Sequence, residues 1–250
     1  MAKKKSIGLS LVIPCFNEPE NISLVIAKLK KIVSSANHPF EIIIVDGCSD
    51  DETPSILIEE FKSLDRDKFK LILMEQRKGY GNDIVEGLRR ARYDILGWTH
   101  ADLQTDLQDV IKGFELYNSS DSKKLIVKGK RKKRQALEVI LTMGMQVVTF
   151  FLLKTNLNDI NAQPKIFSKQ FFKSFLENDA PSDFSLDLYL LYMAKKNNFE
   201  IFTFPVLFKK RLLGEAKGGG GSWENKLNLI SRTFKYILRL RRELIIETEQ

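Results

Sequence analysis

The sequence predicts an α/β protein with a mainly parallel, twisted sheet, helices on both faces of the sheet, and an amphipathic helix at the C-terminal end. Two observations predict this class. Short apolar runs alternate with stretches of helical period through the first half of the chain. These runs, such as LVIP, IIIV and LILM, are continuous, which is typical of parallel strands buried on both faces. A chain of 250 residues is long enough for one well-buried domain.

The first half of the chain carries the clearest signals. We expect four strands there, at Leu9–Pro14, Glu41–Asp46, Phe69–Met74 and Tyr93–Trp98. Three helices connect them, over Asn21–Val33, from Thr53-Pro54 onward, and over Gly79–Ala91. Proline near a first helical position supports the second of these helices.

The pattern is looser in the second half. Helices are expected at Asp106–Leu116, Ala136–Lys154, Phe184–Lys196 and Trp223–Leu244. Strands are expected at Leu125–Lys128 and Glu200–Phe208, and Gly218–Gly221 is expected to be a hinge before the terminal helix.

Composition narrows the function classes. Cys15 and Cys48 are far apart and stand in no CxxC or Cys/His cluster, which excludes the common zinc spacings and predicts reduced thiols. No apolar segment follows the basic N-terminus, so we expect a cytoplasmic protein. The longest uncharged run, Val139–Leu153, is shorter than the ~20 residues that a membrane span needs.

Acidic residues follow two of the predicted strands. Asp46 ends one strand, and Asp102 with Gln104 follows another. In open α/β sheets the ligand crevice lies beyond the carboxyl ends of the strands, so a polar ligand is expected there. The sequence has no GxGxxG after the first strand and no GxxxxGK[ST]. A phosphate would therefore be neutralised in another way, for example by a divalent metal on carboxylate oxygens.

Four segments together resemble the family 2 glycosyltransferases, and most closely their dolichol-phosphate-mannose-synthase-like branch. The resemblance covers roughly residues 8 to 217 and is carried by VIPCFNE at 12–18, VDGCSDDET at 45–53, KGYGN at 78–82 and ADLQ at 101–104. It implies the Rossmann-like GT-A fold, a nucleotide-diphosphate sugar donor, a divalent metal (Mn²⁺ or Mg²⁺), inversion at the anomeric carbon, and a role in cell-envelope glycan synthesis. It also implies a domain over 1–217, with a nucleotide-binding half at 1–105 and an acceptor half at 106–217, followed by the hinge and basic helix at 218–250.

The resemblance also implies site residues. The residues that match donor-binding segments are Pro14, Phe16, Glu18, Asp46, Asp51, Lys78, Gly79, Ala101, Asp102 and Lys217. Metal ligands would be Asp102 and Gln104, with His100 beside them. Arg211 matches a basic residue that faces phosphate, and Asp187 matches an acidic residue near the acceptor. The acceptor or its phosphate would meet Arg131, Arg134 and Gln163.

Three positions depart from the pattern of this branch. His100 stands where the branch has the first aspartate of DxD, Gly47 replaces an aspartate, and Ala216 replaces a serine. A neutral imidazole removes one negative charge, which implies weaker metal binding or a metal held mostly by the donor diphosphate. His100 could be a ligand, a donor to a ligand, or a solvent-facing histidine at a strand end.

The expected chemistry is a single displacement. The leaving diphosphate would be stabilised by the metal and by Arg211, with Lys217 or Arg131 as further candidates. A hydroxyl acceptor would need a base, for which Asp187 is the candidate, whereas a polyprenyl phosphate is already ionised and would need none.

Other interpretations stay open at this point. Asp46 and Asp51 could cap the helix that opens at Thr53, and Asp187 could be part of a helix-start charge pair. The acceptor could be a soluble or glycan hydroxyl, and the chain could be a nucleotidyltransferase or a non-catalytic nucleotide-binding protein.

The net charge of +8 is concentrated in two regions, and it suggests the kind of partner. Six of the seven residues at 128–134 are basic, and six more lie at 226–242. No aromatic residues interleave the first run, so we expect no nucleic-acid partner and favour an acceptor phosphate or an anionic lipid surface. The terminal helix suits such a surface, which would make the protein peripheral on the cytoplasmic face, but it could instead pack on the sheet or on a second subunit of a homo-oligomer.

Overall fold

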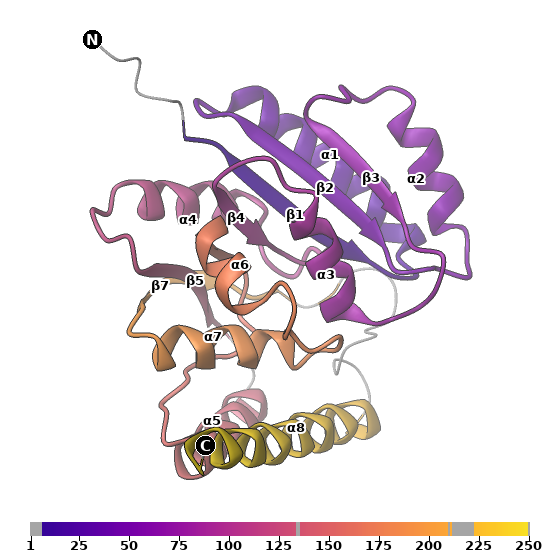
Figure 1. Ribbon diagram of the computed structural model, residues 1–250. Coiled ribbons are helices and arrows are strands. Elements are labelled where there is room, and N and C mark those ends of the chain that lie inside the picture. The colour runs from indigo at the N-terminus through magenta and orange to yellow at the C-terminus, as the bar shows by residue number, and fades with distance from the viewer. Residues whose placement is uncertain (1–6, 134–135, 210, 212–222, 250) are drawn as a thin grey trace.

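The computed structural model describes residues 7–133, 136–209, 211 and 223–249 (Figure 1). Within these ranges one seven-stranded sheet has the order β3-β2-β1-β4-β6-β5-β7. Its strands are β1 (Leu9–Cys15), β2 (Phe40–Asp46), β3 (Phe69–Leu73), β4 (Ile95–Trp98), β5 (Leu125–Lys132), β6 (Lys165–Ser168) and β7 (Glu200–Leu207). The helices are α1 (Pro19–Ser35), α2 (Thr53–Phe61), α3 (Tyr80–Arg89), α4 (Gln108–Asn118), α5 (Ala136–Leu153), α6 (Lys169–Phe175), α7 (Leu186–Lys196) and α8 (Trp223–Glu249).

The sheet is mainly parallel, as predicted. The pairs β1–β2, β2–β3, β1–β4 and β5–β7 are parallel, and only β6 among the described strands runs against its neighbours, β4 and β5. The register pairs Cys15 with Asp46 and Val12 with Trp98. The segments that follow β1, β2 and β4 therefore meet at one edge of the sheet.

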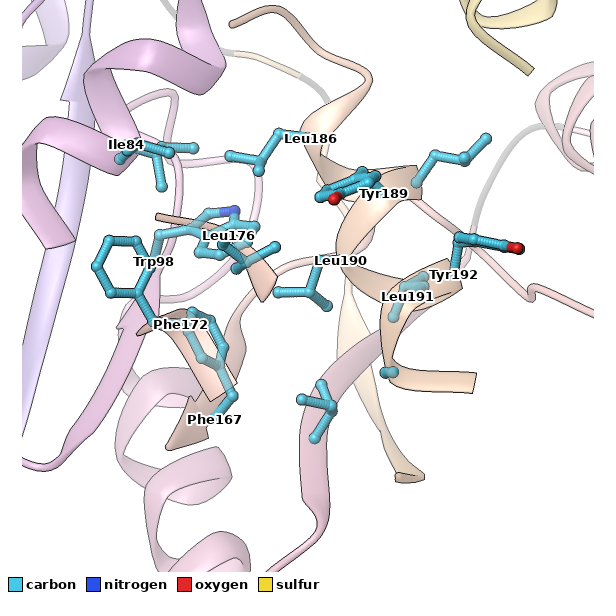
Figure 2. Packing of buried hydrophobic residues seen from close by; sticks show 14 of the residues in the cluster. Ile84, Trp98, Phe167, Phe172, Leu176, Leu186, Tyr189, Leu190, Leu191 and Tyr192 are labelled. Atoms are coloured by element: carbon cyan, nitrogen blue, oxygen red, sulfur yellow. The ribbon is translucent and has the colours of Figure 1, made fainter. Parts of the chain in front are cut away.

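Two apolar layers cover the sheet. Alternate residues of the central strands face opposite ways: Leu11 and Ile13 pack under α1, α2 and α4, whereas Val12 faces α3, α6 and α7. In Figure 2, side chains from α3, α7 and the sheet meet around Trp98 in the second layer. Trp98 contacts Phe167 edge to face, with the ring centroids 5.4 Å apart. Continuous apolar strands are therefore required, because both faces are buried.

The sequence interpretation missed two neighbouring elements, β6 and α6. The segment around Gln163-Pro164 contains a cis peptide bond and leads directly into β6. The strand is only four residues long and begins with a lysine, so its sequence lacks an apolar run of strand length. Its pairing with β4 and β5 depends on contacts far away in the chain.

The long helices α5 and α8 contact each other and lie side by side at one end of the molecule (Figure 1). Tyr236, Ile237 and Leu240 of α8 are buried in the same apolar layer as α7. Part of α8 thus packs on the protein, whereas its contact with a membrane surface or with a second subunit stays a prediction. No described helix is both long and apolar enough to cross a membrane. The predicted hinge at 218–221 lies outside the described residues, and the division into domains stays a prediction.

Candidate active site

The loops that follow β1 and β2 are tied together at the carboxyl edge of the sheet. Asn17 has a positive φ of 53°, and its backbone N–H donates to Ser49 Oγ at 2.9 Å. Its side-chain amide donates to Asp50 at 2.6 Å and accepts from the Asp50 backbone N–H at 3.1 Å. The Glu18 N–H donates to Thr53 Oγ1 at 2.9 Å. These bonds fix the two loops as one wall of the site.

The two aspartates after β2 have different surroundings. Asp46 is buried and accepts hydrogen bonds from the backbone N–H and the hydroxyl of Ser49. Asp51 is exposed and accepts the backbone N–H of Thr53 at 2.8 Å, at the start of α2. The helix-capping interpretation therefore describes the contact of Asp51, whereas Asp46 orders its own loop at the site wall.

The loop after β4 holds Asp102. The Asp102 carboxylate accepts the backbone N–H of Gln104 at 3.0 Å and lies 3.7 Å from His100 Nδ1. Burial acts to raise the pKa of Asp102, but His100, the Gln104 N–H and Arg211 outweigh it, so the pKa lies below its ordinary value. The side-chain amide of Gln104 donates to the Lys209 carbonyl at 3.2 Å. Asp102 is therefore an ionised carboxylate at the carboxyl end of β4.

The donor set around Asp102 fits a metal that is only partly held by protein. Among the residues whose placement is known, no group of three or more His, Cys, Asp or Glu side chains is arranged around one metal position. One carboxylate, with His100 and Gln104 beside it, suits an ion that takes its remaining ligands from water and from substrate phosphates, as Mg²⁺ commonly does. That a metal here is held mostly by the donor diphosphate stays a prediction.

A basic residue from far along the chain completes this edge. Arg211 donates from Nη2 to Glu18 Oε2, and the two side chains are only 12% and 9% exposed. The same Glu18 oxygen accepts from Asn21 Nδ2 at 2.8 Å. Because Arg211 also lowers the pKa of Asp102, its positive charge acts on both the β1 loop and the β4 loop. The matching residue Lys217 lies outside the described residues.

The loop before α3 closes on the chain ahead of α7. Gly79 has a φ of 108°, and a Cβ there would lie 2.7 Å from the Ser182 carbonyl oxygen, so only glycine fits. The Arg77 guanidinium lies 3.7 Å from the ring centroid of Phe16. Of the other predicted donor residues, Lys78 is exposed, Pro14 is partly buried and Ala101 is buried. The predicted donor residues that the structure describes thus lie on the strand ends and loops at this edge.

A chain of polar contacts leads from the β4 loop to α7. The Tyr80 hydroxyl lies 2.9 Å from His100 Nε2, and Gln163 Nε2 lies 3.5 Å from the same hydroxyl. Gln163 Nε2 also donates to Asp187 Oδ1 at 3.0 Å. The Tyr80 ring stacks on Phe184 with centroids 4.5 Å apart. His100 is therefore hydrogen-bonded to Tyr80 within the protein. The interpretation of a purely solvent-facing histidine is wrong.

Asp187 is part of a buried ion pair that the sequence did not reveal. Its carboxylate is 1% exposed and accepts from Lys165 Nζ, and Lys165 is fully buried. Lys165 also donates to the Ala162 carbonyl at 3.2 Å. Burial lowers the pKa of Lys165 despite its carboxylate partner. The only sequence signal for this pair is the lysine that begins β6, ahead of Ile166 and Phe167. A free base role for Asp187 stays a prediction, and this geometry favours positioning.

The basic run at 128–134 is partly structural. Lys128 is 1% exposed, and its Nζ donates to the carbonyls of Gly129, Asn158 and Asp159 at 3.1, 3.1 and 2.9 Å. Burial lowers the pKa of Lys128 to about 7. Arg131 donates from Nε to Asp159 Oδ1 at 2.8 Å. The expectation that the run meets a phosphate or a lipid surface is therefore wrong for Lys128, and Arg134 lies outside the described residues.

The Asp83 side chain packs against the backbone of Gly47, a contact that the sequence did not predict. A Cβ at Gly47 would lie 2.4 Å from Asp83 Oδ2, so the Asp83 carboxylate occupies the space that a side chain at position 47 would fill. Asp83 is 4% exposed, and burial together with nearby Asp46 raises its pKa to about 6. Gly47 stands where the family pattern has an aspartate. In this chain the carboxylate of Asp83, from α3, lies beside that strand end.

Two known enzymes are similar in sequence to this chain. Over 248 residues the chain is 22% identical to a dolichyl-phosphate β-glucosyltransferase of Dictyostelium discoideum, covering 93% of this chain and 76% of that protein. A dodecaprenyl-phosphate galacturonate synthase of Rhizobium johnstonii is 30% identical over 108 residues, 42% of this chain and 31% of its own length.

Among solved structures, glucosyl-3-phosphoglycerate synthase of Mycobacterium tuberculosis, in complex with Mn²⁺, UDP and glucosyl-3-phosphoglycerate, superposes with a TM-score of 0.70 at 16% identity. The match covers 95% of this chain and 80% of that one, and it shows the same fold. The family model described as "Glycosyl transferase family 2" matches residues 10–176. The chain belongs to glycosyl transferase family 2.

Proposed function

We propose that this glycosyltransferase moves a sugar from a nucleotide-diphosphate donor to a polyprenyl phosphate, with inversion, at the cytoplasmic face of a membrane. The observation that supports it best is the Glu18–Arg211 ion pair at the carboxyl edge of the sheet, with an arginine whose charge also acts on Asp102. Acidic and basic groups side by side there suit a metal-bound diphosphate, because the carboxylate can hold the cation while the guanidinium faces phosphate oxygens.

A divalent ion would be held by Asp102, with His100 and Gln104 beside it, and by donor phosphate oxygens. When bound, Mn²⁺ or Mg²⁺ neutralises charge that develops on the leaving diphosphate. The structural neighbour named above was crystallised with Mn²⁺ and UDP, which supports a metal-dependent donor site here.

The residues of this chain then have separate tasks. The wall formed by Asp46 and the loop of Phe16 would receive the base and ribose. Arg211 would stabilise the diphosphate as the bond between the anomeric carbon and its oxygen breaks and the electron pair leaves with that oxygen. An acceptor oxygen would form the new bond from the opposite face of the sugar, which inverts the anomeric centre.

The state of Asp187 supports an acceptor that needs no base. Its carboxylate is buried and paired with Lys165, so removal of an acceptor proton would require this ion pair to break. A lipid phosphate is already ionised, whereas a hydroxyl acceptor would need a base. The names of the two relatives, a dolichyl-phosphate transferase and a dodecaprenyl-phosphate synthase, support the same acceptor class.

The test is transfer of radiolabelled sugar from a panel of UDP- and GDP-sugars to a short polyprenyl phosphate in detergent with Mn²⁺. We expect label in the organic phase, and none with EDTA. Label that appears only on 3-phosphoglycerate or on a glycan hydroxyl would assign the enzyme to a soluble acceptor. Nucleotide binding without any transfer or donor hydrolysis would indicate a non-catalytic protein.

A further inference from the structure

Helix α5 is apolar on two sides, and only one of them is covered. Its inner side contributes Met145, Val148 and Leu152 to the apolar layer beside α7. Its outer side exposes large apolar side chains that recur at helical spacing: Val139, Met143, Val147, Phe150 and Phe151, with exposed fractions of 39%, 57%, 54%, 54% and 72%. Large exposed apolar surfaces of this kind usually mark an interaction site.

Helix α8 adds two exposed apolar side chains at the same end of the molecule (Figure 1). It lies beside α5 at the same end of the molecule (Figure 1) and exposes Leu227 (59%) and Phe234 (40%), which are two turns apart. We call these seven side chains of α5 and α8 the α5–α8 surface. We propose that the α5–α8 surface docks the enzyme on an anionic lipid bilayer, with the apolar side chains inserted at the boundary between headgroups and acyl chains.

The charges around this surface favour a bilayer over a second copy of the chain. Arg232, Lys235, Arg241 and Arg242 are exposed on α8, and the approach to α5 carries exposed Lys132 and Lys133. Pairing two copies through this surface would bring these cations together, whereas anionic headgroups would neutralise them. An apolar helix surface flanked by basic residues is the pattern of helices that lie in a membrane interface.

The position of α5 in the chain connects the surface to the acceptor side of the site. Arg131 stands shortly before α5 and Asp159 shortly after it, and their ion pair joins the two ends of this insertion. The segments that flank α5 are therefore held together at Arg131, one of the residues expected to meet an acceptor phosphate. The use of the surface for lipid acceptors rests on the proposed function, but docking itself rests on exposure and charge alone.

Vesicle flotation of the full chain, without donor, tests the proposal. Phosphatidylcholine vesicles with and without about 30% phosphatidylglycerol would be compared, since anionic headgroups should strengthen binding. We expect the parent chain to float with the anionic vesicles, and Phe150→Glu/Phe151→Glu to reduce the floated fraction by roughly tenfold. Leu24→Glu/Ile58→Glu is the matched control, because these side chains are 44% and 48% exposed on α1 and α2. The control should float like the parent.

Three results would overturn the proposal: a parent chain that stays at the bottom of the gradient, equal flotation with neutral vesicles, or a Phe150→Glu/Phe151→Glu variant that floats like the parent. A parent that is dimeric by light scattering, does not float, and becomes monomeric in this variant would assign the surface to a second copy. Circular dichroism melts confirm that each variant is folded. Transfer to a short polyprenyl phosphate in detergent needs no docking, so failure of docking and failure of the proposed function are separate results.

Discussion

The carboxylate of Asp83 should destabilise the folded protein at neutral pH, and Asp83→Asn should therefore stabilise it. Burial raises the pKa of Asp83 from 3.8 to about 6. About two pKa units, at about 1.36 kcal/mol each, amount to roughly 3 kcal/mol at pH 7.5. The penalty is absent below pH 3.8, grows between pH 3.8 and 6, and is constant above pH 6, so it falls to about 1 kcal/mol at pH 4.5.

Thermal melts of the parent and Asp83→Asn at pH 7.5 and pH 4.5 test this reasoning. For a chain of 250 residues, 3 kcal/mol corresponds to a rise in Tm of roughly 5 to 10 °C at pH 7.5. A rise of only a third of that is expected at pH 4.5. Asp121→Asn, at an exposed position, is the control and should change Tm little at either pH. An equal effect of Asp83→Asn at both pH values would refute the account, because a buried charge would then not be the cause.

Three further substitutions test other contacts. Lys165→Met should lower the free energy of unfolding, measured in urea, by about 3–5 kcal/mol, because it leaves the Asp187 carboxylate buried without its ion-pair partner. The double variant Lys165→Met/Asp187→Leu should recover most of that loss. Equal losses in the single and the double variant would contradict this reasoning. Gly47→Ala should lower the free energy of unfolding by about 1–3 kcal/mol, but by much less in an Asp83→Ala background. Additive effects in this double-mutant cycle would show that the two positions do not interact. Arg211→Met should reduce kcat for sugar transfer by roughly 10²-fold or more at saturating donor, and an effect on KM alone would remove Arg211 from stabilisation of the leaving group.

The donor side of the site was predictable from the sequence because its signals are local. Continuous apolar runs predict parallel strands, and the carboxyl ends of parallel strands meet at one edge of a sheet. The positions of Asp46 and Asp102 follow from this rule alone. The structure confirms the mainly parallel sheet, and the family match confirms the family to which these motifs point.

Several contacts of the site were less predictable because they join distant parts of the chain. Glu18 and Arg211 are 193 residues apart, and no local pattern predicts their ion pair. Lys128 stood in the basic run expected to meet phosphate or lipid, and no local pattern predicted that it or Lys165 is buried, since lysine is almost never fully buried without a partner. Their burial depends on carbonyl groups and on a carboxylate that only the folded chain brings near. For the same reason, the sequence suggested a free Asp187.

The central claim is that the Asp102 edge binds a nucleoside diphosphate through a divalent metal. A thermal-shift panel of UDP, GDP, CDP and ADP, each with and without Mn²⁺, tests it most directly in the parent and in Asp102→Ala. A nucleotide at 100 times its Kd stabilises by about 2.7 kcal/mol, which is a readily measured rise in Tm. We predict that at least one nucleotide raises the Tm of the parent only with Mn²⁺, and that Asp102→Ala abolishes this rise. A rise that is independent of Mn²⁺, or that survives in Asp102→Ala, would contradict the account.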